Sequence, residues 1–313
     1  MAGSLVERRD GSGPSGGAGN RDGDACVMGT VPFMSALPDF LDQPSFDPIP
    51  PEALPDEPRP PRQWWGNHPA ELRWQAELLR LLVDPVFRGE GVPRGNGQPV
   101  VLIPGFLAGD ASLSVMRNWL TRLGYVPNVS GITANVDCSD RAVDRLDARV
   151  ARLHEQTGKR VALIGHSRGG HFAKALARRR PEWISCVVSL GAGLDLPFDI
   201  SIPTRATVAA FRELHRLTSD RIARNGCFTE TCRCQFAADY AAEFPASVPL
   251  TSVYSKGDGV VWWEACVVPY ATNVEVTGSH IGLAFNRKAY RAVAEALAAA
   301  PAPDASVPAS VLA

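Results

Sequence analysis

Lys159 to His171 reads KRVALIGHSRGGH, and the interpretation of the whole chain starts from this stretch. Its apolar run, Val161 to Ile164, predicts a short buried strand, and the residues from His171 to Arg180 suit a helix. Between them lies a G-x-S-x-G pentapeptide, Gly165 to Gly169, centred on Ser167. The pattern predicts a sharp turn that lifts the serine hydroxyl off the sheet edge, with glycines where strand and helix pack closely.

Apolar runs alternate with helical patterns from Gln98 onward, as is typical of an α/β protein whose parallel sheet is covered on both faces. The strands are predicted at 100–103, 131–136, 161–164, 186–190, 250–254 and 274–276, and the helices at 111–123, 141–156, 170–179 and 289–299. No strand is predicted between Leu194 and Pro249.

The segment before this alternating region predicts one more helix, Pro69 to Leu82. Its apolar residues Leu72, Ala76, Leu79 and Leu82 recur at helical spacing, so we expect this face to pack on the domain. Residues 63–300 are therefore predicted to form the folded domain. Residues 1–62 are rich in Gly, Pro and Ser and are predicted to be disordered, and 301–313 to form a loose tail.

Composition and charge argue against several classes of partner. The net charge is −1 with 45% hydrophobic residues, so neither a nucleic-acid partner nor an electrostatically held membrane surface is indicated. Arg178 to Arg180 is more typical of a helix C-terminus than of a phosphate site. No apolar stretch reaches the roughly 18 residues of a membrane span, and no secretory signal is evident. We therefore expect a cytoplasmic protein without an integral membrane segment.

The pentapeptide in its strand–turn–helix setting resembles the nucleophile elbow of the α/β-hydrolases, and most of all their lipase and esterase-like members. Three further motifs carry the resemblance in the same order: PGFLAGD at 104–110, SKGDGVV at 255–261 and GSHIGL at 278–283. The resemblance implies a mostly parallel sheet flanked by helices. It also implies a lid inserted after the sixth strand of the fold, for which the interval of about 194–249 has the right place.

The resemblance implies a Ser–Asp–His triad, because a serine hydroxyl needs an imidazole to take its proton and a carboxylate to orient that imidazole. Of the histidines downstream of Ser167, His171 lies in the helix after the turn and His215 in a predicted helix of the lid. His280 follows a strand, where the family places its catalytic histidine, and is favoured as the base.

The third triad position is predicted to be Asp258, in a Gly-Asp-Gly directly after the 250–254 strand. Gly-Asp-Gly by itself is also simply a good turn. Its place between the serine and histidine strands favours the triad role. Glu264 and Asp195 are the rival acids, the latter because some hydrolases place their acid after the earlier strand.

An oxyanion hole requires two backbone N–H groups. The resemblance assigns one to Arg168, directly after the serine, and the other to Phe106, with Leu107 as the fallback. Pro104 stands where the family often has histidine, a departure that leaves the backbone donor intact.

Apolar side chains near these motifs are candidates for an acyl pocket. They are Phe106, Leu107, Trp262 and Trp263, although such residues are equally what protein cores contain. The substrate expected from the resemblance is a small-molecule ester with an apolar acyl group.

Four cysteines, Cys227, Cys232, Cys234 and Cys266, lie near the lid and the Asp258 motif. They lack a paired C-x-x-C, so no metal site is predicted. A disulfide such as Cys234–Cys266 and free buried thiols both remain open, because a reducing cytosol disfavours disulfides.

The predicted function is that of a carboxylic ester hydrolase acting through an acyl-enzyme intermediate, with no metal or organic cofactor. Two alternatives use the same residues differently. An acyltransferase would pass the acyl group to an alcohol or amine instead of water, and a hydrolase-like binding protein would not turn over its ligand.

Overall fold

The computed structural model describes residues 64–218 and 232–300, so the predictions for 1–62 and 301–313 lie outside the described residues. Within the described part, six strands form one parallel sheet in the order β2-β1-β3-β4-β5-β6. The strands are β1 (Pro99–Ile103), β2 (Val126–Val129), β3 (Val161–His166), β4 (Ile184–Leu190), β5 (Leu250–Tyr254) and β6 (Thr272–Glu275). The predicted α/β class with a mostly parallel sheet is confirmed.

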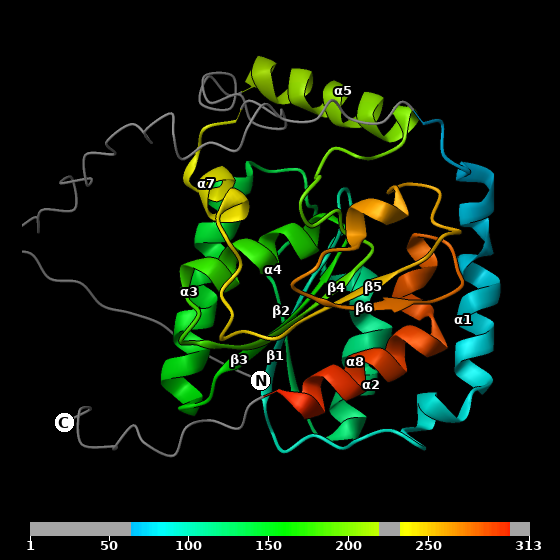
Figure 1. The fold of residues 1–313 in the computed structure, drawn as a ribbon, viewed down its shortest axis with the longest axis vertical. Coiled ribbons are helices and arrows are strands. Elements are labelled where there is room, and N and C mark those ends of the chain that lie inside the picture. The colour runs from blue at the N-terminus through cyan, green and yellow to red at the C-terminus, as the bar shows by residue number, and fades with distance from the viewer. Residues whose placement is uncertain (1–63, 219–231, 301–313) are drawn as a thin grey trace, which may run out of the picture. The chain divides into compact units, whose positions relative to one another are not determined.

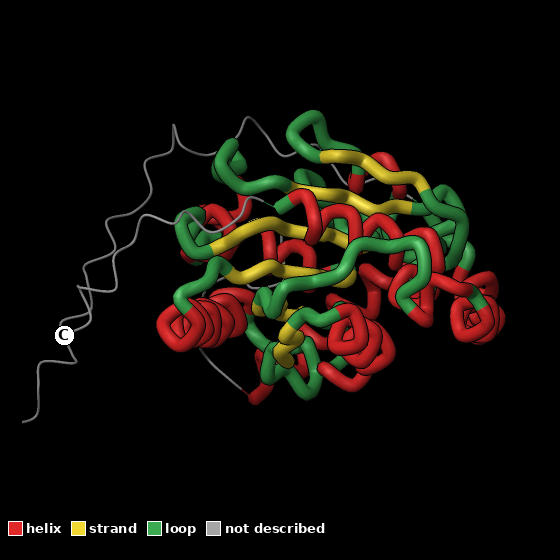
Figure 2. Tube along the Cα trace, turned by 90° about the horizontal axis from the view of Figure 1, so that it is seen from below, coloured by secondary structure: helices red, strands yellow, loops and turns green. Residues whose placement is uncertain are grey.

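Helices cover both faces of this sheet, and each face has its own hydrophobic cluster. The helices α3 (Ser139–Thr157) and α4 (Arg168–Arg179) pack on one face, and α2 (Ser114–Leu123) and α8 (Arg287–Ala299) pack on the other (Figure 1). Figure 2, viewed from below, shows the strands side by side between helices. Every residue of β1, β3 and β4 is buried, as the continuous apolar runs predict.

Short 3₁₀ helices connect several of these elements. They are η2 (His68–Arg73), η3 (Pro85–Arg88), η4 (Asp110–Leu113), η5 (Trp263–Cys266) and η6 (Ile281–Phe285). Two of them, η2 and η6, lie close to the residues that are candidates for catalysis.

The strand predicted at 131–136 is wrong, because the edge strand of the sheet is β2, Val126–Val129. It pairs with β1 in the register Pro99–Val126 to Leu102–Val129. Its sequence VPNV has neither a long apolar run nor alternation, and Val126 is half exposed, so the sequence pattern is weak there. The more apolar residues that follow form a loop that is held by the Asp110 carboxylate at Ser130 and Gly131.

The helix predicted at Pro69–Leu82 exists as η2 followed by α1 (Trp74–Val83), but the predicted packing face is wrong. Leu72 and Leu79 are 70% and 64% exposed, and Ala76 and Leu82 are exposed as well. The helix packs through the face that carries Glu71, Trp74, Glu77 and Leu81. This face combines apolar contacts of Trp74 and Leu81 with hydrogen bonds that two glutamates accept, as described below.

The interval predicted as a lid lies between β4 and β5 and contains α5 (Ile202–Thr218) and α7 (Gln235–Ala241). It therefore follows the fourth of the six strands described here. In Figure 1 α5 runs above α4, and its Phe211 ring packs edge-on against Phe106 after β1, 5.7 Å between ring centroids. The interval's role as a lid stays a prediction.

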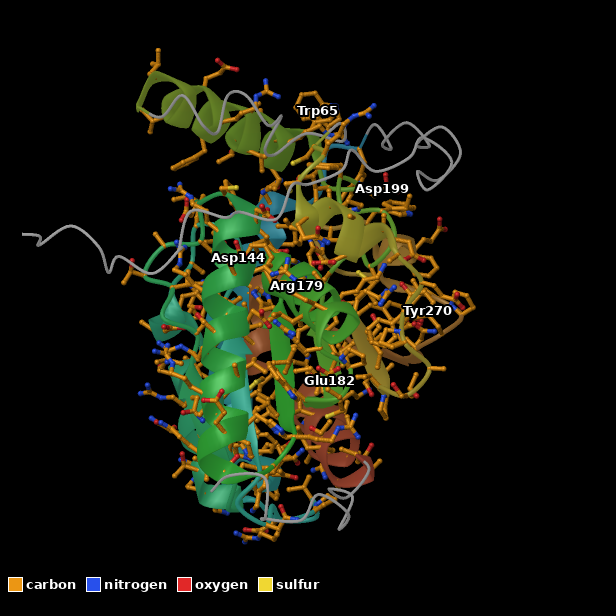
Figure 3. All side chains as sticks on the ribbon, turned by 90° about the vertical axis from the view of Figure 1, so that its left-hand side faces the viewer. Trp65, Asp144, Arg179, Glu182, Asp199 and Tyr270 are labelled. Atoms are coloured by element: carbon orange, nitrogen blue, oxygen red, sulfur yellow. The ribbon has the colours of Figure 1, made fainter. Side chains whose placement is uncertain are left out.

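The arginine run 178–180 has a structural role in this fold. Arg179 pairs with Asp144 of α3 at 2.7 Å and with Asp239 of α7 at 2.7 Å, and Figure 3 shows Arg179 next to Asp144. Arg180 pairs with Asp147 of α3 at 3.0 Å. These contacts join three helices, so Arg179 and Arg180 stabilise the packing of α4 on α3 and α7.

In the described ranges, no helix has the length and apolar character needed to cross a membrane. The cysteines in the same ranges are free thiols, and these include Cys234 and Cys266. The bridge suggested between those two residues is therefore absent.

Candidate active site

Ser167 occupies a strained turn at the end of β3, with φ 51° and ψ −123°. Glycines make this turn possible. A Cβ on Gly165 would lie 2.3 Å from the Gly169 carbonyl oxygen, and one on Gly169 would lie 2.1 Å from that of Ile103. In the described residues only Ser167 and Leu107 combine a positive φ with a side chain. Strain of this kind concentrates at functional sites, and both residues belong to the predicted catalytic motifs.

Asp258 and His280 form a buried pair at the same edge of the sheet, after β5 and β6. His280 Nδ1 lies 2.7 Å from Asp258 Oδ2. The other carboxylate oxygen, Oδ1, accepts the N–H groups of Val260 and Val261, each at 2.8 Å. The carboxylate is thus fixed in orientation, and it holds the imidazole with Nδ1 as the donor and Nε2 available as a base.

The pKa of His280 lies above its ordinary value although the side chain is buried. Burial lowers it, but the negative charge and hydrogen bond of Asp258 raise it, as does the charge of Glu71, and together these outweigh the burial. The pair therefore stabilises a positive charge on the imidazole, which is the charge that a general base acquires.

His166, next to the serine, is held neutral and structural. Burial first, and then the charge of His280, lower its pKa to about 4. Its Nε2 lies 2.9 Å from the His280 carbonyl oxygen, which a neutral ring contacts as an N–H donor. This bond joins the serine turn to the histidine loop.

Gly191, at the end of β4, leaves room for the acid–histidine pair. Its φ is +63°, and a Cβ there would lie 3.2 Å from both Asp258 Oδ2 and His280 Nδ1. A larger residue would crowd the hydrogen bond between them.

The loop after β1 approaches the serine directly. A Cβ on Gly105 would lie 3.1 Å from the Ser167 Cβ. The Leu107 N–H donates to the Asn135 carbonyl at 3.4 Å, whereas the Phe106 N–H has no hydrogen-bond partner in the described residues. This favours Phe106 over Leu107 as the oxyanion donor from this loop.

The Arg168 side chain, for which the sequence predicted no role, supports this loop through Asn135. Its guanidinium donates to the backbone oxygen and Oδ1 of Asn135, both at 3.0 Å, and to the Asp137 carbonyl at 2.8 Å. Asn135 Nδ2 in turn donates to the Pro104 carbonyl at 2.7 Å. Asn135 lay in the mispredicted strand, so no sequence signal marked it.

The chain was also compared with known proteins. No family model matches the chain. It is 36% identical over 99 residues to the triacylglycerol lipase of Vibrio cholerae serotype O1 (strain ATCC 39315 / El Tor Inaba N16961), a match of 30% of this chain and 31% of the relative. The chain thus spans about a third of the relative's length.

Two solved structures resemble the chain at low identity. The mature lipase BlEst2 of Bacillus licheniformis is 15% identical, with a TM-score of 0.47 over 66% of this chain and 94% of its own. The monoacylglycerol lipase of Paleococcus ferrophilus is 16% identical, with a TM-score of 0.44 over 66% of this chain and 96% of its own.

The deciding observation is the order of elements in this chain itself. A strained serine turn follows β3, an aspartate follows β5 and a histidine follows β6, on a parallel sheet of order β2-β1-β3-β4-β5-β6. This order of elements is that of the α/β-hydrolase fold.

The rival candidates for the acid and the histidine have other contacts or other surroundings. Asp195 pairs with Lys174 at 2.8 Å, and Glu264 is exposed. Burial, with Arg168 and Lys174 adding to it, lowers the pKa of His171 to about 3, and its ring packs on another helix. The side chain of His215 lies outside the described residues.

Two of the candidate pocket residues line one cavity. Trp262 and Trp263 line a cavity of about 350 Å³ beside Asp258, together with Trp64, Arg73 and Lys256. Neither Ser167 nor the 105–107 loop contributes to it. A role for the two tryptophans in acyl binding stays a prediction.

No group of three or more His, Cys, Asp or Glu side chains in the described ranges is arranged to hold a metal ion.

Proposed function

We propose that this α/β-hydrolase cleaves carboxylic esters through a Ser167–Asp258–His280 triad, as an esterase or lipase. The observation that carries the proposal is the buried 2.7 Å contact between His280 Nδ1 and Asp258 Oδ2, at the sheet edge where Ser167 is held in its strained turn. The local identity to a triacylglycerol lipase supports the same class of reaction.

In the first step, the Ser167 hydroxyl oxygen attacks the ester carbonyl carbon while His280 Nε2 takes the hydroxyl proton. The carbonyl π electrons move to the oxygen, which the N–H groups of Arg168 and Phe106 stabilise. Asp258 stabilises the imidazolium that forms, consistent with the raised pKa of His280.

In the second half, the tetrahedral intermediate collapses and the bond to the alkoxy group breaks. His280 gives its proton to the departing alcohol and leaves an acyl group on Ser167. Water, deprotonated by His280, then attacks this acyl-enzyme and releases the carboxylic acid.

The proposed substrate is a small-molecule ester with an apolar acyl group. Phe106 carries the proposed oxyanion donor and packs against Phe211 of α5, so an apolar surface adjoins the reacting carbonyl. Leu107 beside it is 48% exposed. In this proposal residues 63–300 are the catalytic domain and about 194–249 its lid.

The test is hydrolysis of a series of nitrophenyl esters of increasing acyl length by the wild type and by Ser167→Ala. We expect activity that Ser167→Ala abolishes, with an optimum that defines the acyl length. An unchanged rate in the variant would exclude the mechanism.

Two further measurements separate the alternatives. Product analysis with a competing alcohol distinguishes hydrolysis from acyl transfer. Labelling of Ser167 by a fluorophosphonate is expected for either enzyme and not for a non-catalytic binding protein.

A further inference from the structure

The segment just before the alternating α/β region packs directly on the two loops that carry the acid and the histidine. Figure 1 shows α1, in cyan, beside the orange-to-red segment that follows β6. The contact is made through η2 and the first turn of α1, and its polar centre is Glu71, which is only 6% exposed.

Glu71 accepts hydrogen bonds from both loops at once. Its Oε1 accepts the Gly259 N–H at 2.8 Å and the His280 N–H at 3.0 Å, and its Oε2 accepts the Ile281 N–H at 2.9 Å. Gly259 directly follows Asp258. One carboxylate therefore links the backbone beside the acid to the backbone of the histidine.

Glu77, two turns further along, holds the residue before the histidine. Its Oε1 accepts the Ser279 N–H and its Oε2 accepts the Ser279 hydroxyl, both at 2.9 Å. The hydrogen bonds of Glu77 are therefore made to the histidine loop and not to the acid loop.

Glycines show how closely these surfaces fit. A Cβ on Gly66 would lie 2.2 Å from the Gly259 carbonyl oxygen, and one on Gly259 would lie 2.6 Å from that of Asn67. A Cβ on Gly282 would overlap the Glu77 carboxylate at 1.3 Å. The backbone of the segment before η2 therefore lies against that of the acid loop, and the histidine loop lies against the Glu77 side chain. This close packing restricts the movement of the two carboxylates.

A carboxylate is the group that suits this position. It has only acceptor sites, and here all its partners are N–H donors. A glutamine of the same shape would turn an NH₂ group towards at least one of those donors and would lack the negative charge.

We propose that Glu71 is a positioning residue of the active site, which fixes the distance between the acid loop and the histidine loop and adds a second negative charge near His280. This inference rests on the proposed triad.

The groups facing His280 come from several elements. The Asp258 carboxylate faces it from the loop after β5, Glu71 from η2, and the neutral His166 ring from the end of β3, 4.9 Å away between ring centroids. Glu71 is the second carboxylate that raises the pKa of His280. Removal of its charge should therefore lower that pKa.

The test compares Glu71→Gln with the matched control Glu77→Gln in the full-length protein. For Glu71→Gln we expect kcat to fall by about tenfold to 100-fold with KM little changed, the loss typical of misplaced catalytic groups. The acid limb of the kcat/KM profile should move to lower pH. For Glu77→Gln the limb should stay in place, because Glu77 contacts Ser279 and not His280. An unchanged kcat and an unmoved limb in Glu71→Gln overturn the inference.

A second variant covers the case in which Glu71→Gln loses its cooperative thermal unfolding transition. Glu71→Asp keeps the charge but is one methylene shorter, so we expect a lower kcat with the acid limb near its wild-type position. Wild-type kcat in Glu71→Asp would contradict the positioning role.

Histidine NMR separates this inference from the proposed function. The His280 resonance, assigned by its loss in His280→Ala, should titrate at lower pH in Glu71→Gln than in the wild type. This holds whether or not the protein turns over an ester. If Ser167→Ala leaves ester hydrolysis unchanged, the proposed function fails while the NMR shift still tests the charge of Glu71. If the wild type is active and the His280 titration does not move, the inference fails alone.

Discussion

The serine turn and the acid–histidine loops form the two halves of the proposed site, and they are held in different ways. At Ser167 the geometry is steric, because Gly165 and Gly169 let strand and helix approach to distances that no Cβ could tolerate. The loops of Asp258 and His280 are held by hydrogen bonds. Several of these donate to carboxylates of η2 and α1, which lie at least 188 residues earlier in the chain. Local sequence encodes the first half, and tertiary contacts assemble the second.

The largest effect is expected from a substitution that removes the hydrogen bond between the Asp258 carboxylate and His280. In Asp258→Asn the amide cannot hold His280 in the required tautomer, and we expect kcat to fall by about 10⁴-fold, as for an aspartate in this role. Steady-state hydrolysis of a nitrophenyl ester measures it. Asp195→Asn is the control, since the Asp195 carboxylate is half exposed and pairs with Lys174. A comparable loss in the control would move the acid role to Asp195.

The next largest effect is expected from a substitution that disrupts the close packing around the serine turn. Gly169→Ala places a Cβ 2.1 Å from the Ile103 carbonyl oxygen, so β1 and α4 must separate. We expect a loss of about 3 kcal/mol or more in the free energy of unfolding, at the upper end of overpacking. Urea denaturation measures it.

Gly158→Ala is the matched control for this change. Gly158 has φ +63°, but a Cβ there meets nothing within 4 Å, so only backbone strain remains. We expect a loss of about 1 kcal/mol. Equal losses in the two variants would show that close packing around the serine turn is not what requires glycine.

The smallest expected effect is a change in the pH dependence of activity and stability, which depends on the Asp258–His280 pair. The acid limb of kcat/KM should have its midpoint above 6.5, because the pKa of His280 is raised above that value in the folded protein. The sign for stability follows from the same shift. The pair's contribution is complete below the unfolded pKa and is lost as pH rises through the folded pKa. In Asp258→Asn both effects should shrink, and a midpoint well below 6.5 in the wild type would contradict the paired histidine.

The sequence predicted most of the sheet because its central strands are buried on both faces and therefore read as apolar runs. It missed β2, an edge strand with a proline and an asparagine, whose pairing with β1 supplies what its own residues do not. It also reversed the packing face of η2 and α1. The periodicity counted only apolar residues, whereas the face that packs mixes Trp74 and Leu81 with Glu71, which is buried among hydrogen-bond donors.

At the site, the sequence by itself determined the serine turn, since Gly165, Ser167 and Gly169 are neighbours whose strand–turn–helix setting is local. It also indicated Asp258 and His280, because parallel strands end at one edge of the sheet. Only the tertiary structure shows which groups contact the loops of the proposed site. These are the Glu71 and Glu77 carboxylates, and Arg168 with Asn135, which bonds to the Pro104 carbonyl. The physical reason is that a hydrogen bond between residues far apart in the chain leaves no periodicity in either segment, so its partners are known only once the fold brings them together.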